Sequence, residues 1–151
     1  MPTWSARPGS CRSKAQGTVV LVNCVVYRNG HRVADIGLDD IPKWRGQSGT
    51  FVWVALHDAT DEELQQIQER FDLHDLAIED VKNGHQRAKM EEYDDVLFVI
   101  MPLLEMKDRD ISIGEVSIFV AEDFVLSVRA RCSRGFLGVR ARAEREPELL
   151  R

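Results

Sequence analysis

The sequence predicts one α/β domain built on a mixed, largely antiparallel β-sheet flanked by helices. Three observations predict this class: apolar β-branched runs of strand length, an Asn-Gly pair between two strand candidates, and a capping box that opens a helically spaced segment. The 151 residues suffice for one domain with a core and are few for two. Residues 1–17 are interpreted as a disordered lead or vector-derived segment, and residues 18–151 as the domain.

The chain is expected to begin with a hairpin. Val19–Tyr27 is β-branched and apolar, which indicates a strand. Asn29-Gly30 is the strongest two-residue hairpin signal, so His31–Ile36 should return beside it.

A short connection and a helix follow. Leu38–Ile41 is predicted to form one helical turn that Pro42 ends, and a loop follows. Phe51–Leu56 is apolar throughout, which indicates a strand buried on both faces. The capping box at Thr60 predicts a helix to about Phe71. Three apolar residues at helical spacing form its inward stripe: Leu64, Ile67 and Phe71.

The next stretch says most about function. An acidic turn or short helix, Leu73–Val81, leads into a polar bend, Lys82–Arg87. A charged strand, Lys89–Asp95, then meets an almost purely apolar strand, Val96–Met101.

The last part of the chain predicts a three-stranded antiparallel meander and a helix. The three strands are Val96–Leu104, Ile111–Val120 and Phe124–Arg129. The helix begins at Phe136, and Pro147 interrupts or kinks it. Four residues give it a weak stripe: Leu137, Val139, Arg140 and Ala143.

Charge and composition exclude several classes. The formal net charge is -5, which does not favour nucleic-acid binding. Residues 58–95 carry 13 acids against 4 basic residues, and this excess attracts cations or a basic partner. No apolar run reaches the ~18 residues of a membrane helix, so the sequence as given is not expected to span a bilayer. Three cysteines without CxxC spacing indicate reduced thiols in a cytosolic protein.

Enzyme motifs are absent, and we expect no enzyme. The sequence contains neither a GxSxG elbow nor a Walker loop. A metal site from His74, Asp75, Glu79 and His85 is conceivable, but none of these histidines has a usual ligand spacing. Solvated loop histidines and capping groups are therefore the favoured interpretation.

The adjacent acids Glu79 and Asp80 lie in an otherwise apolar frame. On a helix, neighbouring side chains point about 100° apart, so one can bond inward while the other faces a partner. Carboxylate oxygens suit Mg²⁺, which keeps most of its waters and needs only one or two carboxylates. A solvated helix face with capping acids explains the same pair, and the chemistry alone favours that explanation.

The run HDLAIEDVKNGHQRAKMEEYDDVLFVIM resembles the cytosolic N-terminal domain of CorA-type divalent-metal transporters. That family has the form H-P-L-x-x-E-D-x-x-N-x-H-Q-R-P-K-x-E-x-Y-x-x-x-L-F. The chain departs from it at Asp75 and Ala88, where the family has proline. The matching residues are His74, Leu76, Glu79, Asp80, Asn83, His85, Gln86, Arg87, Lys89, Glu91, Tyr93, Leu97 and Phe98. The resemblance covers roughly residues 51–129.

The resemblance implies the cation-sensing domain of a Mg²⁺ transporter, soluble as this fragment and held at the cytoplasmic face of the inner or plasma membrane by a C-terminal part. In the family, a divalent cation binds between neighbouring cytosolic domains of a homopentamer. The resemblance implies that Asp80 is a ligand and Glu79 its auxiliary, and that the ion is Mg²⁺, with Co²⁺, Ni²⁺ or Zn²⁺ as alternatives. Two other functions stay open: a zinc-transporting member of the same family, and a free-standing soluble binding module.

Overall fold

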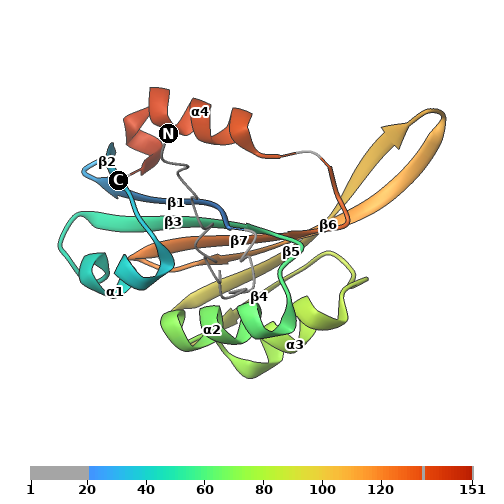
Figure 1. The fold of residues 1–151 in the computed structure, drawn as a ribbon, viewed down its shortest axis with the longest axis horizontal. Helices are drawn as coiled ribbons and strands as arrows, with labels where there is room; N and C mark the ends of the chain where they lie inside the picture. Colours follow the sequence, from blue (N-terminus) through green and yellow to red (C-terminus); the bar gives the residue numbers. More distant parts are fainter. Residues whose placement is uncertain (1–20, 134, 151) are drawn as a thin grey trace, which may run out of the picture.

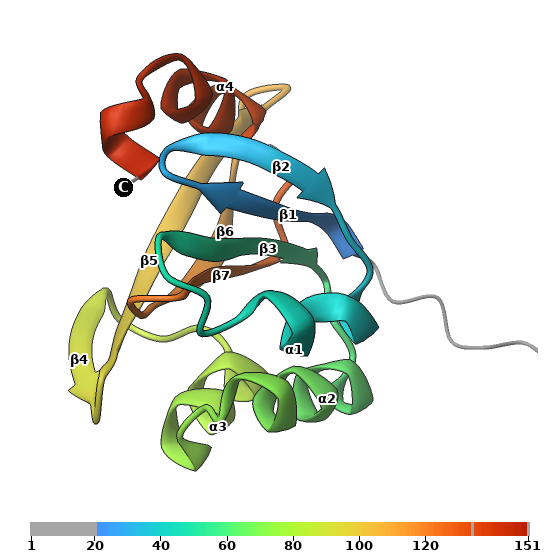
Figure 2. The same cartoon turned by 90° about the vertical axis from the view of Figure 1, so that its left-hand side faces the viewer.

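A seven-stranded sheet forms the middle layer of the protein, with α1, α2 and α3 on one face and α4 on the other (Figures 1 and 2). The computed structural model describes residues 21–133 and 135–150. The predicted lead 1–17 lies outside the described residues. The strands are β1 Leu21–Arg28, β2 His31–Asp35, β3 Thr50–His57, β4 Lys89–Tyr93, β5 Val96–Lys107, β6 Asp110–Val120 and β7 Phe124–Ala130. The helices are η1 Leu38–Asp40, α1 Ile41–Trp44, α2 Asp61–Phe71, α3 Asp75–Asn83, α4 Leu137–Arg145 and η2 Pro147–Leu150.

The strand order is β2-β1-β3-β7-β6-β5-β4. The β3–β7 pair is parallel, and the other five pairs between the described strands are antiparallel. The sheet is therefore mixed and largely antiparallel, as predicted. Among the described residues, no helix is both long and apolar enough to cross a membrane.

The predicted first hairpin is confirmed. Asn29 and Gly30 adopt φ values of 50° and 81°, the left-handed conformation that a two-residue turn of this kind requires. β2 returns antiparallel to β1. The residues proposed before Leu21 as the start of the first strand lie outside the described part of the chain.

The role predicted for Pro42 is wrong. Pro42 is the second residue of α1 and begins that helix instead of ending one. Proline is tolerated there because the N–H that it lacks would have no partner in the first turn of a helix. The predicted single turn is divided between η1 and α1.

The main core lies between the sheet and α2 and α3. The predicted capping box is present, since the Glu63 backbone N–H donates to Thr60 Oγ1 and Thr60 N–H donates to Glu63 Oε2. The predicted inward stripe of α2 is buried, and Phe71 packs on Phe124 with ring centroids 4.5 Å apart. On β3, only one face is fully buried, and Phe51 and Trp53 on the other are half-buried.

The stripe predicted for α4 is half wrong. Ala143 is buried and Arg140 half-buried, but Leu137 and Val139 are exposed. Polar contacts set this rotation, because Glu144 accepts hydrogen bonds from Tyr27 Oη at 2.7 Å and from Arg140 Nε at 3.0 Å. Pro147 interrupts the helix as predicted, and η2 begins there.

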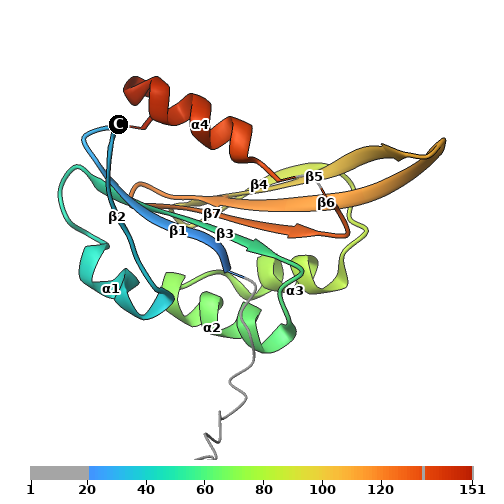
Figure 3. The same cartoon turned by 45° about the horizontal axis from the view of Figure 1, so that its top comes forward.

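The predicted meander is confirmed and is longer than expected. β5 runs through Pro102 to Lys107 and pairs with β6 along its whole length. β4 pairs only as far as Ile100, so Pro102 lies on a free edge of the sheet, where proline is tolerated. The β5–β6 hairpin therefore extends beyond the sheet (Figure 3).

Candidate functional site

The acidic segment after α2 forms the helix α3, as one of the two predicted alternatives. His74 caps it, because His74 Nδ1 accepts a hydrogen bond from the Leu76 N–H at 3.2 Å. The same imidazole stacks on Tyr93, with centroids 4.5 Å apart. The helix ends at Gly84, whose φ of 60° favours glycine. One side chain thus fixes both the start of α3 and its position over β4.

The two adjacent acids of α3 point in different directions, as the helical geometry predicts. Ala77 and Ile78 face the core, and Glu79 is exposed. The side chain of Asp80 is only 21% exposed, and its Oδ2 accepts a hydrogen bond from Lys89 Nζ at 2.6 Å. Asp80 is therefore the acid that bonds inward, and Glu79 is the acid open to solvent.

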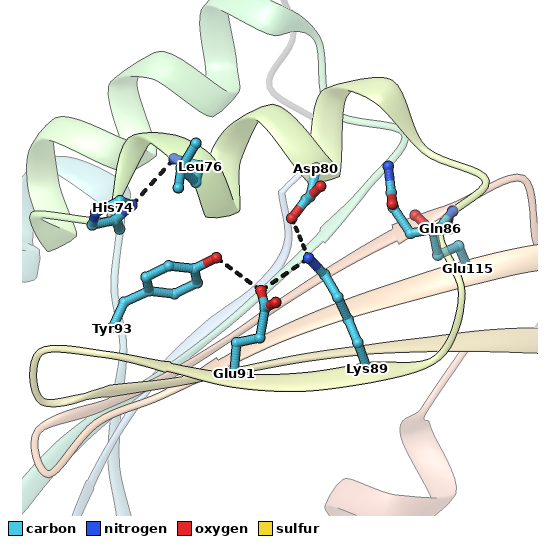
Figure 4. A network of polar contacts seen from close by, with 8 residues as sticks. All are labelled: His74, Leu76, Asp80, Gln86, Lys89, Glu91, Tyr93 and Glu115. Carbon is cyan, nitrogen blue, oxygen red and sulfur yellow. Dashed lines mark hydrogen bonds and ion pairs between the residues drawn. The ribbon is translucent and has the colours of Figure 1, made fainter.

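Three residues of β4 face α3, because alternate residues of a strand lie on one side. Lys89, Glu91 and Tyr93 form a chain of contacts that ends on Asp80 (Figure 4). Lys89 Nζ also donates to Glu91 Oε2 at 2.9 Å, and Tyr93 Oη donates to the same oxygen at 2.8 Å. The Lys89 ammonium lies 5.9 Å from the centroid of the Phe98 ring.

The charges in this network stabilise one another. Hydrogen bonds to Asp80 and then to Glu91 raise the pKa of Lys89. The hydrogen bond from Lys89, followed by that from Tyr93, lowers the pKa of Glu91. The hydrogen bond to Glu91 raises the pKa of Tyr93. One ammonium is thus shared by two carboxylates that come from different elements.

A buried acid supports the connection between α3 and β4. Glu115 of β6 is 4% exposed, and its Oε2 accepts a hydrogen bond from the backbone N–H of Gln86 at 3.0 Å. The guanidinium of Arg131 lies 3.8 Å from the same oxygen. These contacts fix the connection between α3 and β4, which ends directly before Lys89.

The histidines near the acids do not lie together. His74 is at the start of α3 and His85 lies beyond its end, and nine helical residues span about 13 Å. The capping role favoured for these histidines is confirmed for His74. Within the described ranges 21–133 and 135–150, no group of three or more His, Cys, Asp or Glu side chains is arranged to hold a metal ion.

A groove of about 980 Å³ is lined by His74, Tyr93, Asp94 and the β6–β7 turn, among other residues. Its Asp123 is bound by Arg45 Nε at 2.8 Å, and the Arg45 guanidinium lies over Phe71 and Phe124. The acid in this groove is thus held by a guanidinium, whereas Asp80 is held by a lysine ammonium.

Sequence reasoning identified Asp80 and Glu79 and missed the residues around them. The sequence places Lys89, Glu91 and Tyr93 on a charged strand but does not predict their contact with Asp80, and it assigns no role to Glu115. The alternation of Lys89, Glu91 and Tyr93 was the available signal, since spacing of two places side chains on one face of a strand. No pattern in the neighbouring sequence indicates that Glu115 is buried and accepts a hydrogen bond from the backbone of Gln86.

Comparison with known proteins gives a consistent result. A family model described as CorA-like Mg²⁺ transporter protein matches residues 48–149. YfjQ of Bacillus subtilis (strain 168), which is named as a metal ion transporter, is 31% identical over 99 residues. That match covers 66% of this chain and 30% of YfjQ, so the chain spans less than a third of the relative.

Three solved structures share the fold. Full-length CmaX matches with a TM-score of 0.70 at 13% identity, over 87% of this chain and 41% of CmaX. The ZntB cytoplasmic domain from Vibrio parahaemolyticus RIMD 2210633 matches with 0.61 at 10% identity, over 85% and 51%. The complete CorA magnesium transporter from Methanocaldococcus jannaschii matches with 0.57 at 13% identity, over 84% and 38%. The family model covers most of the chain and the fold agrees with it, so this protein belongs to the family of CorA-like Mg²⁺ transporter proteins.

Proposed function

We propose that this chain is the cytosolic cation-sensing domain of a divalent-cation transporter. A divalent ion, Mg²⁺ in the first place, binds Asp80 with Glu79 as its auxiliary, where one copy of the domain meets the next in a homopentamer. The supporting observation is that α3 of this CorA-like domain carries the two acids next to each other, with Glu79 exposed and Asp80 partly exposed beside Lys89. A segment beyond residue 151, with two apolar stretches of ~20 residues, would hold the domain at the cytoplasmic face of the membrane.

The donor chemistry fits a hard divalent ion. Asp80 and Glu79 offer only carboxylate oxygens, and Mg²⁺ is bound in proteins by one or two carboxylates while it keeps several waters. Co²⁺, Ni²⁺ and Zn²⁺ also accept oxygen ligands, but Zn²⁺ usually takes histidine or cysteine as well. The chemistry of the pair therefore favours Mg²⁺ over Zn²⁺.

The energetics fit a sensor. Acids at a contact between copies repel one another, and a bound cation removes that repulsion and favours the closed ring. The ion shifts this balance only by its difference in affinity for the two states. An ion that binds only one state stabilises that state by about 1.4 kcal/mol per site at ten times its Kd, and the sites of the ring add to one another.

Limited proteolysis of the full-length gene product tests this function. Mg²⁺ should slow cleavage of the unsubstituted protein, and Asp80→Ala should abolish that protection. Glu92→Gln is the matched control, because Glu92 is an exposed acid on the opposite face of β4. Equal protection of Asp80→Ala and the control would contradict the assignment of Asp80.

The same assay with other ions identifies the metal. If Zn²⁺ protects at much lower concentration than Mg²⁺ and Co²⁺, a zinc-transporting relative is the better description. If the gene encodes no apolar segments after residue 151, the domain acts as a free-standing binding module.

A further inference from the structure

Lys89 occupies one of the two oxygens that Asp80 could offer to a cation. Its ammonium is 2.6 Å from Asp80 Oδ2 and 2.9 Å from Glu91 Oε2, so it bridges a carboxylate of α3 and a carboxylate of β4 (Figure 4). The Lys89 side chain is 28% exposed. The position is therefore partly shielded from water and already occupied by a positive charge.

Several contacts keep the ammonium in this position. Lys89 pairs with Ile100 at the end of the β4–β5 ladder, which fixes its backbone. Tyr93 Oη donates to Glu91 Oε2 and so orients the second carboxylate toward Lys89. Phe98 presents its ring beneath the ammonium at 5.9 Å. The lysine is thus placed by its surroundings, unlike an exposed lysine that samples many rotamers.

Lys89 holds Asp80 Oδ2, and the second oxygen of this carboxylate points away from the ammonium (Figure 4). A divalent ion on either oxygen would lie within a few ångströms of the ammonium. Mg²⁺ binds oxygens at about 2.1 Å and brings two positive charges. Two cations separated by a hydrogen-bond length repel each other strongly in a partly shielded site. This repulsion favours a state in which Lys89 leaves Asp80 and stays on Glu91 when a divalent ion binds.

Building on the proposed function, we propose that Lys89 is an internal counter-ion that competes with the divalent cation for Asp80 and sets the concentration at which the site fills. A tethered ammonium acts at a high effective concentration, so only an ion that binds more strongly than one positive charge displaces it. Monovalent ions do not meet this condition, and divalent ions do so only when they are abundant.

The same exchange links the site to the fold. In the cation-free domain, Lys89 ties α3 to β4 through Asp80. When the ion binds Asp80, the ion pair between Lys89 and Asp80 is lost, and Lys89 keeps its ion pair with Glu91 in the same strand. Cation binding therefore replaces one contact between α3 and β4, while the stack of His74 on Tyr93 still joins the two elements.

Calorimetric titration of this chain with Mg²⁺ tests the proposal. Lys89→Gln removes the competing charge and should bind Mg²⁺ about tenfold more tightly than the unsubstituted chain. Lys89→Arg keeps the charge and should bind as weakly as the unsubstituted chain. Lys82→Gln is the matched control, because Lys82 is an exposed lysine of the last turn of α3 and its loss changes the net charge equally. Asp80→Asn should cancel the gain of Lys89→Gln.

The outcomes separate the two proposals. If Asp80→Asn weakens binding but Lys89→Gln binds no more tightly than Lys82→Gln, the counter-ion role is overturned and the Asp80 site stands. If Asp80→Asn changes nothing in either background, the site itself fails, and the counter-ion role fails with it. If the Lys89 variants do not fold, NMR of the Lys89 ammonium in the unsubstituted chain decides. Its signal should shift at saturating Mg²⁺, and an unchanged signal refutes the proposal.

Discussion

Tyr27 is the residue whose replacement tests the docking of α4 most sharply. Its side chain is fully buried on the sheet, and its hydroxyl donates to Glu144 of α4 at 2.7 Å. Tyr27→Phe removes this hydrogen bond to a carboxylate with no change in ring packing. Hydrogen bonds to charged groups contribute about 1.5–3 kcal/mol, so we expect a loss of that size in the free energy of unfolding at pH 7.

The pH dependence provides an independent measurement. Burial, and then the hydrogen bond to Glu144, raises the pKa of Tyr27 from 10.0 to about 12. Because the folded-state pKa is the higher one, the contribution to stability is complete below pH 10 and is lost as the pH rises toward 12. Two pKa units correspond to about 2.7 kcal/mol.

Urea denaturation between pH 7 and pH 12 measures both effects. The chain has two tyrosines, so in Tyr93→Phe the tyrosinate absorbance reports on Tyr27 alone. Tyr93 is half-buried, and its replacement should cost less than that of Tyr27. Equal stability of Tyr27→Phe and the unsubstituted chain at pH 7, with the same slope above pH 10, would refute the reasoning.

Two further substitutions test the framework of the site. Glu115→Ala leaves the Gln86 N–H without its partner and should lower the free energy of unfolding by about 1–3 kcal/mol, measured by urea denaturation. Amide hydrogen exchange should also accelerate at residues 84–88. Unchanged exchange at these residues would contradict the role of Glu115. Thr60→Ala removes the cap of α2 and should cost about 1 kcal/mol, whereas Thr60→Ser should cost little; equal losses in the two variants would show that the hydroxyl does not stabilise the helix.

Local signals predicted most of the fold. The Asn29-Gly30 turn and the capping box at Thr60 were correct because their geometry depends on neighbouring residues alone. The stripe of α4 was half wrong because Tyr27, distant in sequence, determines which face of that helix turns inward. The role predicted for Pro42 was wrong because a proline between helical residues is compatible with either the end of one helix or the start of another.

The site was predicted in part. Asp80 and Glu79 were found from a resemblance and their adjacency on α3, and their opposite orientations follow from the helical repeat. The ion pair with Lys89 depends on how β4 packs against α3, which no local pattern determines. Glu115 lies on a third element, and only the folded chain brings it under residue 86.

The central claim is that a divalent ion binds at Asp80. The most direct measurement is a titration of the ¹⁵N-labelled chain with Mn²⁺, which stands in for Mg²⁺ and broadens the amide signals of residues near it. The account predicts that broadening begins at Glu79 and Asp80 and across from them on β4, and that Asp80→Asn removes it. Broadening that is centred elsewhere, or that survives Asp80→Asn unchanged, would contradict the account.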